Sequence, residues 1–194
     1  MHTPHLCTKL PAVGTTVFTT MSALANEHGA VNLGQGFPDF GSDPKLLDMV
    51  NDAMRAGHNQ YPMMTGAAPL REAIAAKIGT LYGHDYDAAR AITVTAGATQ
   101  ALTTAILCCV HPGDEVIVIE PAYDSYLPAV ALAGGVPVRV GDRGYSVPWD
   151  AVAAAVSPRT RLMIINSPHN PTGSVLRQAD IEALAAIVDG TDTK

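Results

Sequence analysis

Hydrophobic and polar positions divide the chain into a first part of helices and loops and a later part of alternating strands and helices. The spacing of apolar residues predicts helices over residues 15–27, 44–55 and 68–82, each followed closely by a glycine. Residues 31–40 and 59–66 are punctuated by glycine and proline. These two segments are therefore expected to be ordered loops.

The pattern changes at about residue 92, where short apolar segments begin to alternate with helical periodicity. Strands are predicted at residues 92–95, 115–120, 136–140 and 161–165. Helices are predicted at residues 98–110, 123–133, 150–156 and 178–188. Strands that alternate with helices are typical of a parallel sheet covered on both faces, so the chain is expected to have an α/β fold.

Composition narrows the possible partners and the compartment. The net charge of −6 argues against nucleic acid or an anionic membrane as a partner, because binding either one needs a basic face. No apolar run is long enough to span a bilayer, and the first ten residues do not have the pattern of a signal peptide. Cys7, Cys108 and Cys109 have no zinc-binding spacing. They are expected to be buried thiols in a reducing cytoplasm.

The most informative segment is the octet Asn166-Ser167-Pro168-His169-Asn170-Pro171-Thr172-Gly173, which follows a predicted strand. In an α/β sheet, the carboxyl ends of the strands are where ligands bind. Two prolines restrict the backbone here, so the loop can hold the Asn170 amide in one place.

A second candidate is the turn Ala96-Gly97-Ala98-Thr99 between a predicted strand and a helix. A helix start offers backbone N–H groups and a partial positive charge to a phosphate, and Ala98 and Thr99 are small enough for close approach. The alternative is an ordinary connecting turn, which also favours glycine. Gly34 and Gly36 do not indicate a dinucleotide site, because the preceding strand, the third glycine and the following helix are all missing.

Aromatic residues give weaker signals. Tyr123 follows the strand at residues 115–120, so its ring could stack on a planar ligand or simply cap the core. Tyr61 lies in a loop and indicates nothing by itself. Asp39 is interpreted as a turn residue.

Several segments occur in one order and together resemble a known family; they are residues 31–40, 59–61, 66–75, 95–100, 112–114, 120–126 and 166–173. The chain resembles the class I/II, fold-type I, pyridoxal-phosphate-dependent aminotransferases, in the branch of the kynurenine, glutamine and methionine enzymes. The resemblance covers the chain from about residue 9. It implies an arm and substrate-side loop over residues 1–45 and part of the three-layer α/β/α cofactor-binding domain over residues 46–194.

The resemblance implies five contacts with pyridoxal 5'-phosphate. Ala98 and Thr99 would bind the phosphate, Tyr123 would stack on the pyridine ring, and Asn170 would donate to the phenolic oxygen. Tyr61 would reach the phosphate in a partner subunit, so the family's functional unit would be a homodimer. In this family the bond between Asn170 and Pro171 is commonly cis, and we expect the cis form here.

The resemblance also implies a reaction, the transamination of an amino acid with a 2-oxo acid. Gly36 would offer its backbone N–H to the substrate carboxylate. Phe18, Phe37 and Tyr126 would line the pocket for the substrate side chain.

Other parts of the family's site have no counterpart in this sequence. The family binds its cofactor covalently through a lysine in a Ser-x-x-Lys turn, and none of Lys9, Lys45, Lys77 and Lys194 has those neighbours. The aspartate that pairs with the pyridine nitrogen and the arginine that binds the substrate carboxylate are also missing. The chain is therefore expected to be the amino-terminal half of the enzyme and inactive alone. The alternatives are a non-catalytic remnant or cofactor-binding module and an unrelated α/β nucleotide-binding domain.

The missing half has a structural consequence. In the family, the strand at residues 92–95 pairs with strands that come late in the chain. We therefore expect this segment to lack its proper neighbours and the isolated chain to be poorly soluble or molten.

Overall fold

The computed structural model describes residues 7–11, 13–36, 38–141 and 144–189. The chain divides into two units. We call Thr15–Ala96 the helical unit, and Gly97–Lys194 together with Met1–Gly14 the sheet unit. No helix in the described ranges is long and apolar enough to cross a membrane.

The helical unit contains the three predicted helices, α1 (Val17–Glu27), α2 (Pro44–Arg55) and α3 (Ala68–Tyr82). Local sequence explains where they begin and end. The Thr16 hydroxyl accepts a hydrogen bond from the backbone N–H of Thr19, and the Asp43 carboxylate accepts one from the N–H of Lys45. Gly83 ends α3 with a φ of +65°, a conformation that glycine adopts without a steric cost.

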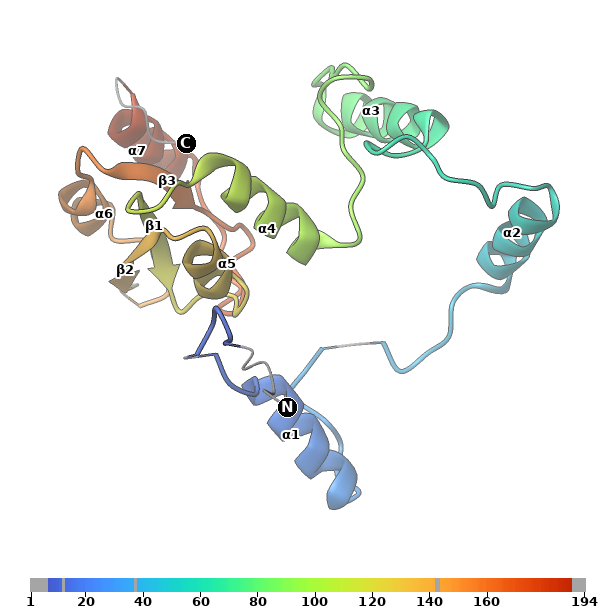
Figure 1. Ribbon diagram of the computed structural model, residues 1–194, viewed down its shortest axis with the longest axis horizontal. Coiled ribbons are helices and arrows are strands. Elements are labelled where there is room, and N and C mark those ends of the chain that lie inside the picture. Colours follow the sequence, from blue (N-terminus) through green and yellow to red (C-terminus); the bar gives the residue numbers. More distant parts are fainter. Residues whose placement is uncertain (1–6, 12, 37, 142–143, 190–194) are drawn as a thin grey trace, which may run out of the picture. The chain divides into compact units, whose positions relative to one another are not determined.

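The sheet unit alternates helices with strands in the order α4 (Ala98–Cys109), β1 (Glu115–Glu120), α5 (Tyr126–Leu132), β2 (Val136–Gly141), α6 (Trp149–Ala155), β3 (Thr160–Ile164) and α7 (Gln178–Val188). The three strands pair in parallel in the order β2-β1-β3 (Figure 1). The α/β pattern predicted for this part of the chain is confirmed.

The central strand β1 shows why both faces of the sheet are covered. Successive side chains of a strand point to opposite faces. Val116 and Val118 pack in a cluster with residues of α4 and α5, whereas Ile117 and Ile119 pack in a second cluster with residues of α6 and α7. Because both faces are buried, β1 reads as a continuous apolar run.

Three details differ from the sequence predictions. Residues 92–95 form no strand; they belong to the helical unit, so the Val94 N–H bonds to the Thr65 carbonyl and not to a strand. Helix α5 begins three residues later than predicted, after a turn at Asp124 and Ser125.

The cysteines are the third difference. Cys7 and Cys108 are exposed and Cys109 is only partly buried, so the prediction of buried thiols is wrong. Cys109 packs at the edge of the cluster between α4 and the sheet, whereas Cys108 is one position further around the helix and lies on its outer face.

The amino end of β1 carries a buried carboxylate that makes stability depend on pH. Glu115 is 8% exposed and accepts hydrogen bonds from the Ser157 hydroxyl and the Arg159 guanidinium. The Ser157 hydroxyl chiefly, and then Arg159, hold the pKa of Glu115 below its ordinary value against the opposing effect of burial. The ionised Glu115 carboxylate is therefore more stable in the folded chain than in the unfolded chain.

We expect Glu115→Gln to remove a pH-dependent part of stability. The stabilisation from Glu115 is complete above the ordinary glutamate pKa, about 4.3, and is lost as the pH falls through the lower folded pKa. The difference in unfolding free energy between wild type and variant should therefore shrink from pH 7 to pH 3. Urea unfolding of a chimera that adds the missing half of the domain, followed by the fluorescence of Trp149, the single tryptophan of this chain, measures it. Glu182→Gln, at an exposed glutamate, is the control. If Glu115→Gln lowered the unfolding free energy equally at pH 7 and pH 3, the pH-dependent role of Glu115 would be contradicted.

Candidate active site

The amino end of helix α4 has the geometry expected of a phosphate site. Gly97 occupies the N-cap with a φ of +84° and has no side chain to cap the first turn. Ala98 and Thr99 open the helix and are exposed. The Thr99 hydroxyl lies 3.4 Å from the Tyr123 hydroxyl, across the start of the helix. Three of the predicted cofactor residues are thus brought together here.

The Tyr123 ring is held from one side by a second tyrosine. The rings of Tyr123 and Tyr126 meet edge to face, with centroids 5.8 Å apart and planes at 75°. Tyr126 is 6% exposed, and burial, with a smaller effect from Tyr123, raises the pKa of its hydroxyl. Tyr126 is therefore part of the core on which Tyr123 rests.

The loop that carries Asn170 is fixed by its own backbone and side chains. The Asn170–Pro171 bond is cis, which confirms the prediction, and the Ser167–Pro168 bond is also cis. The Asn170 N–H donates to the side-chain oxygen of Asn166 at 2.6 Å. Asn170 itself is exposed, so its amide remains accessible at the carboxyl end of β3.

A side-chain network that the sequence did not reveal braces the same loop. His169 Nδ1 and the Thr172 hydroxyl are 2.8 Å apart, and the Thr172 hydroxyl is 2.8 Å from that of Ser174. The His169 N–H also donates to the Ser174 carbonyl at 2.7 Å, which closes the loop on itself. The only sequence signal was the placing of two hydroxyl residues around Gly173.

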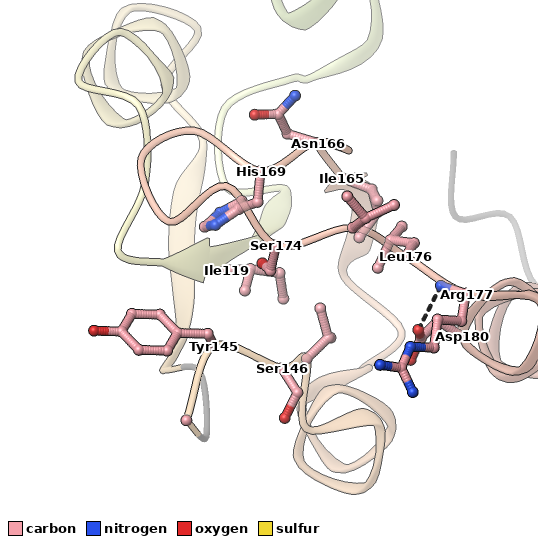
Figure 2. Close-up of a pocket in the computed structure, with 13 residues that line it drawn as sticks. Ile119, Tyr145, Ser146, Ile165, Asn166, His169, Ser174, Leu176, Arg177 and Asp180 are labelled. Atoms are coloured by element: carbon pink, nitrogen blue, oxygen red, sulfur yellow. Dashed lines mark hydrogen bonds between the residues drawn. The ribbon is translucent and has the colours of Figure 1, made fainter.

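A cavity of about 650 Å³ lies beside this loop in the sheet unit. Figure 2 shows His169 and Ser174 on one side of it and Tyr145 and Ser146 on the other. Asn166 and His169 are the members of the octet that line it, whereas Asn170 does not. The sequence analysis missed the cavity because residues 144–147 carry no recognisable motif.

The remaining predicted site residues belong to the helical unit. Tyr61 is fully exposed, Gly36 is exposed and Phe18 is partly buried. Thr99, Tyr123 and Asn170 belong to the sheet unit. Phe37 lies outside the described residues.

Comparison with known proteins now adds to this geometry. Residues 28–192 match the family described as aminotransferase class I and II. The chain belongs to this family. It is 52% identical over 184 residues to the methionine aminotransferase of Escherichia coli, a match that covers 94% of this chain and 48% of that protein. It is 37% identical over 184 residues to human kynurenine–oxoglutarate transaminase 1, covering 87% of this chain and 44% of that protein.

Solved structures agree on the fold of this aminotransferase chain. It matches the structure of an Escherichia coli protein with methionine aminotransferase function at a TM-score of 0.94 and 49% identity, covering 98% of this chain and 50% of the other. It matches N-succinyldiaminopimelate aminotransferase from Mycobacterium tuberculosis at a TM-score of 0.88 and 50% identity, covering 95% and 49%. The predicted fold class, that of the fold-type I aminotransferases, is confirmed. The chain spans about half the length of these relatives.

Proposed function

We propose that this chain supplies part of the site of an enzyme that transfers an amino group from an amino acid to a 2-oxo acid with pyridoxal 5'-phosphate. The observation that carries the proposal is the pairing of the Thr99 and Tyr123 hydroxyls across the start of α4. It joins a helix start suited to phosphate with an aromatic ring suited to a planar ligand. We place the enzyme in the cytoplasm.

The residues of the sheet unit fit the cofactor. Ala98 and Thr99 would bind its phosphate through backbone N–H groups and the Thr99 hydroxyl, because Gly97 leaves the helix start without a side-chain cap. Tyr123, braced by Tyr126, would stack on its ring. Asn170 would donate from a loop that hydrogen bonds hold in place. Transamination takes its electron sink from the bound cofactor, while these residues bind and orient it.

The helical unit would complete the site in a homodimer. We propose that Tyr61 binds the cofactor phosphate of a second copy, which is consistent with its full exposure. We propose that the Gly36 N–H binds the substrate carboxylate, and that Phe18, Phe37 and Tyr126 line the pocket for the substrate side chain. We propose amino-acid and 2-oxo-acid substrates on the ground that the relatives are aminotransferases, and we propose that residues 1–45 form a substrate-side arm.

We propose that the covalent lysine is not in this chain. Lys9, Lys45 and Lys77 are all exposed, and each lacks the apolar surroundings that make a lysine amine nucleophilic. Lys194 lies outside the described residues. The chain would therefore be inactive alone and would act with a second polypeptide segment.

The alternative is a cofactor-binding module without catalysis. Such a module would bind the cofactor reversibly through Thr99, Tyr123 and Asn170 and would gain no activity when the other half of the family's domain is supplied.

A chimera tests the proposed function. It joins this chain to the part of the Escherichia coli methionine aminotransferase that the chain does not match. We expect the chimera to bind pyridoxal phosphate, and Asn170→Ala to weaken binding about tenfold or more, because a hydrogen bond to a charged group contributes about 1.5–3 kcal/mol. Spectroscopic titration measures both affinities. Gln178→Ala, on the exposed start of α7, is the control. Equal affinity for wild type and Asn170→Ala would contradict the assignment.

A further inference from the structure

The helical unit buries a cation where a hydrophobic side chain is expected. In the described part of this unit, Gly66 and Arg71 are the buried residues, and Arg71 is the one buried residue of α3. Arg71 is 5% exposed, yet it forms no ion pair with a carboxylate of the described chain. A buried, unpaired guanidinium is costly, so its contacts are expected to serve a purpose.

Arg71 connects two segments that flank helix α3. Its Nη1 donates to the carbonyl oxygen of Ala89 at 3.2 Å, and its Nη2 lies 4.0 Å from the Met63 sulfur. Its Nε is buried without a partner in the described residues. The guanidinium therefore joins the loop before α3, residues 59–66, to the turn after it.

A second contact fixes the same loop. Gly66 has a φ of +105°, and a Cβ at this position would lie 2.6 Å from Val94 Cγ2. The Val94 N–H donates to the Thr65 carbonyl at 3.0 Å. The carboxyl end of the loop is thus held against residues 89–94 at both Arg71 and Gly66.

The other end of the loop is held by α2. Asn59 donates from its side-chain amide to the Met54 carbonyl and from its backbone N–H to the Gly57 carbonyl, each at 2.8 Å. Tyr61 lies between this anchor and Met63, and it is 100% exposed. The loop therefore presents a tyrosine on a backbone that is fixed on both sides.

We propose that Arg71 is a positioning residue that fixes the loop so that Tyr61 can bind the cofactor phosphate in a second copy of the chain. The inference rests on the proposed function and adds to it the group that holds Tyr61 in place. Arg71 then acts on the partner's site and not on the site of its own subunit.

Amide exchange in the chimera tests the structural half of this proposal without the cofactor. Arg71→Met should raise the exchange rate of the Val94 and Gly66 amides about tenfold, because opening of the loop becomes easier. Arg71→Lys keeps one donor for the Ala89 carbonyl and should have a smaller effect. Arg90→Met removes an exposed arginine from the same turn and should change neither amide. Unchanged exchange in Arg71→Met would overturn the proposal.

Mixed dimers test the functional half. Homodimers of Arg71→Met should bind pyridoxal phosphate about tenfold more weakly than wild type. In a mixed dimer of one Arg71→Met subunit and one Asn170→Ala subunit, both defects fall on the site of the Asn170→Ala subunit. That site lacks the Asn170 amide and also receives the Tyr61 loop of the Arg71→Met subunit. The other site then has an intact Asn170 and receives an intact Tyr61 loop, so half of the sites should regain wild-type affinity.

Each result decides a different question. No tight site in the mixed dimer, with weakened homodimers, would show that Arg71 acts within its own subunit and would overturn the proposal. Wild-type affinity of the Arg71→Met homodimer would overturn it as well. A wild-type chimera that binds no cofactor would instead refute the proposed function, and the amide exchange at Val94 would still show whether Arg71 holds the loop.

Discussion

Expressed by itself, the chain is expected to self-associate and to bind a hydrophobic dye, without a single cooperative melting transition. Helices α1 and α2 of the helical unit contain no buried residue. Leu33, Phe40 and Met64 are each more than three-quarters exposed. A domain is stabilised by only about 5–15 kcal/mol, so a unit that buries so little apolar surface has no margin.

Unpaired strand edges add to this effect. In the described sheet, β2 and β3 each pair with β1 alone, so each has one edge without a strand. Such edges favour pairing between molecules. Size-exclusion chromatography, dye fluorescence and amide exchange are the measurements. A monomeric chain that melts cooperatively and protects the amides of residues 92–95 would contradict the prediction.

Covalent labelling has the second large expected effect. After incubation with pyridoxal phosphate and reduction with borohydride, the isolated chain should carry no stoichiometric adduct at any one lysine. The physical reason is that Lys9, Lys45 and Lys77 are exposed and lack a site that would activate one of them over the others. Peptide mapping by mass spectrometry measures the label at each position. A single, fully labelled lysine would contradict the expectation.

The sequence predicted the sheet unit closely because its signals are local. The apolar run at residues 116–119 is bounded by a turn and is buried on both faces, as is typical of an inner strand. Residues 92–95, Ile-Thr-Val-Thr, also have side chains that favour strands but form none, because strand formation depends on pairing with other segments and not on local composition alone.

The site shows the same distinction between local and long-range information. The rigidity of the Asn170 loop was predicted from its two prolines, whereas its cis bond was predicted from the family resemblance. The bracing of that loop by His169 and Thr172 was missed, because side-chain hydrogen bonds depend on geometry that only the folded loop supplies. Arg71 was missed because an arginine on an amphipathic helix normally lies on the solvent face.

Cofactor mapping in the chimera tests the central claim most directly, namely that this chain is the phosphate- and ring-binding part of an aminotransferase site. The chimera is incubated with pyridoxal phosphate, reduced with borohydride and mapped. The account predicts one stoichiometric adduct per subunit, on a lysine of the Escherichia coli part, and loss of that adduct at limiting cofactor in Asn170→Ala. A folded, dimeric chimera without the adduct, or with the adduct on a lysine of this chain, would contradict it.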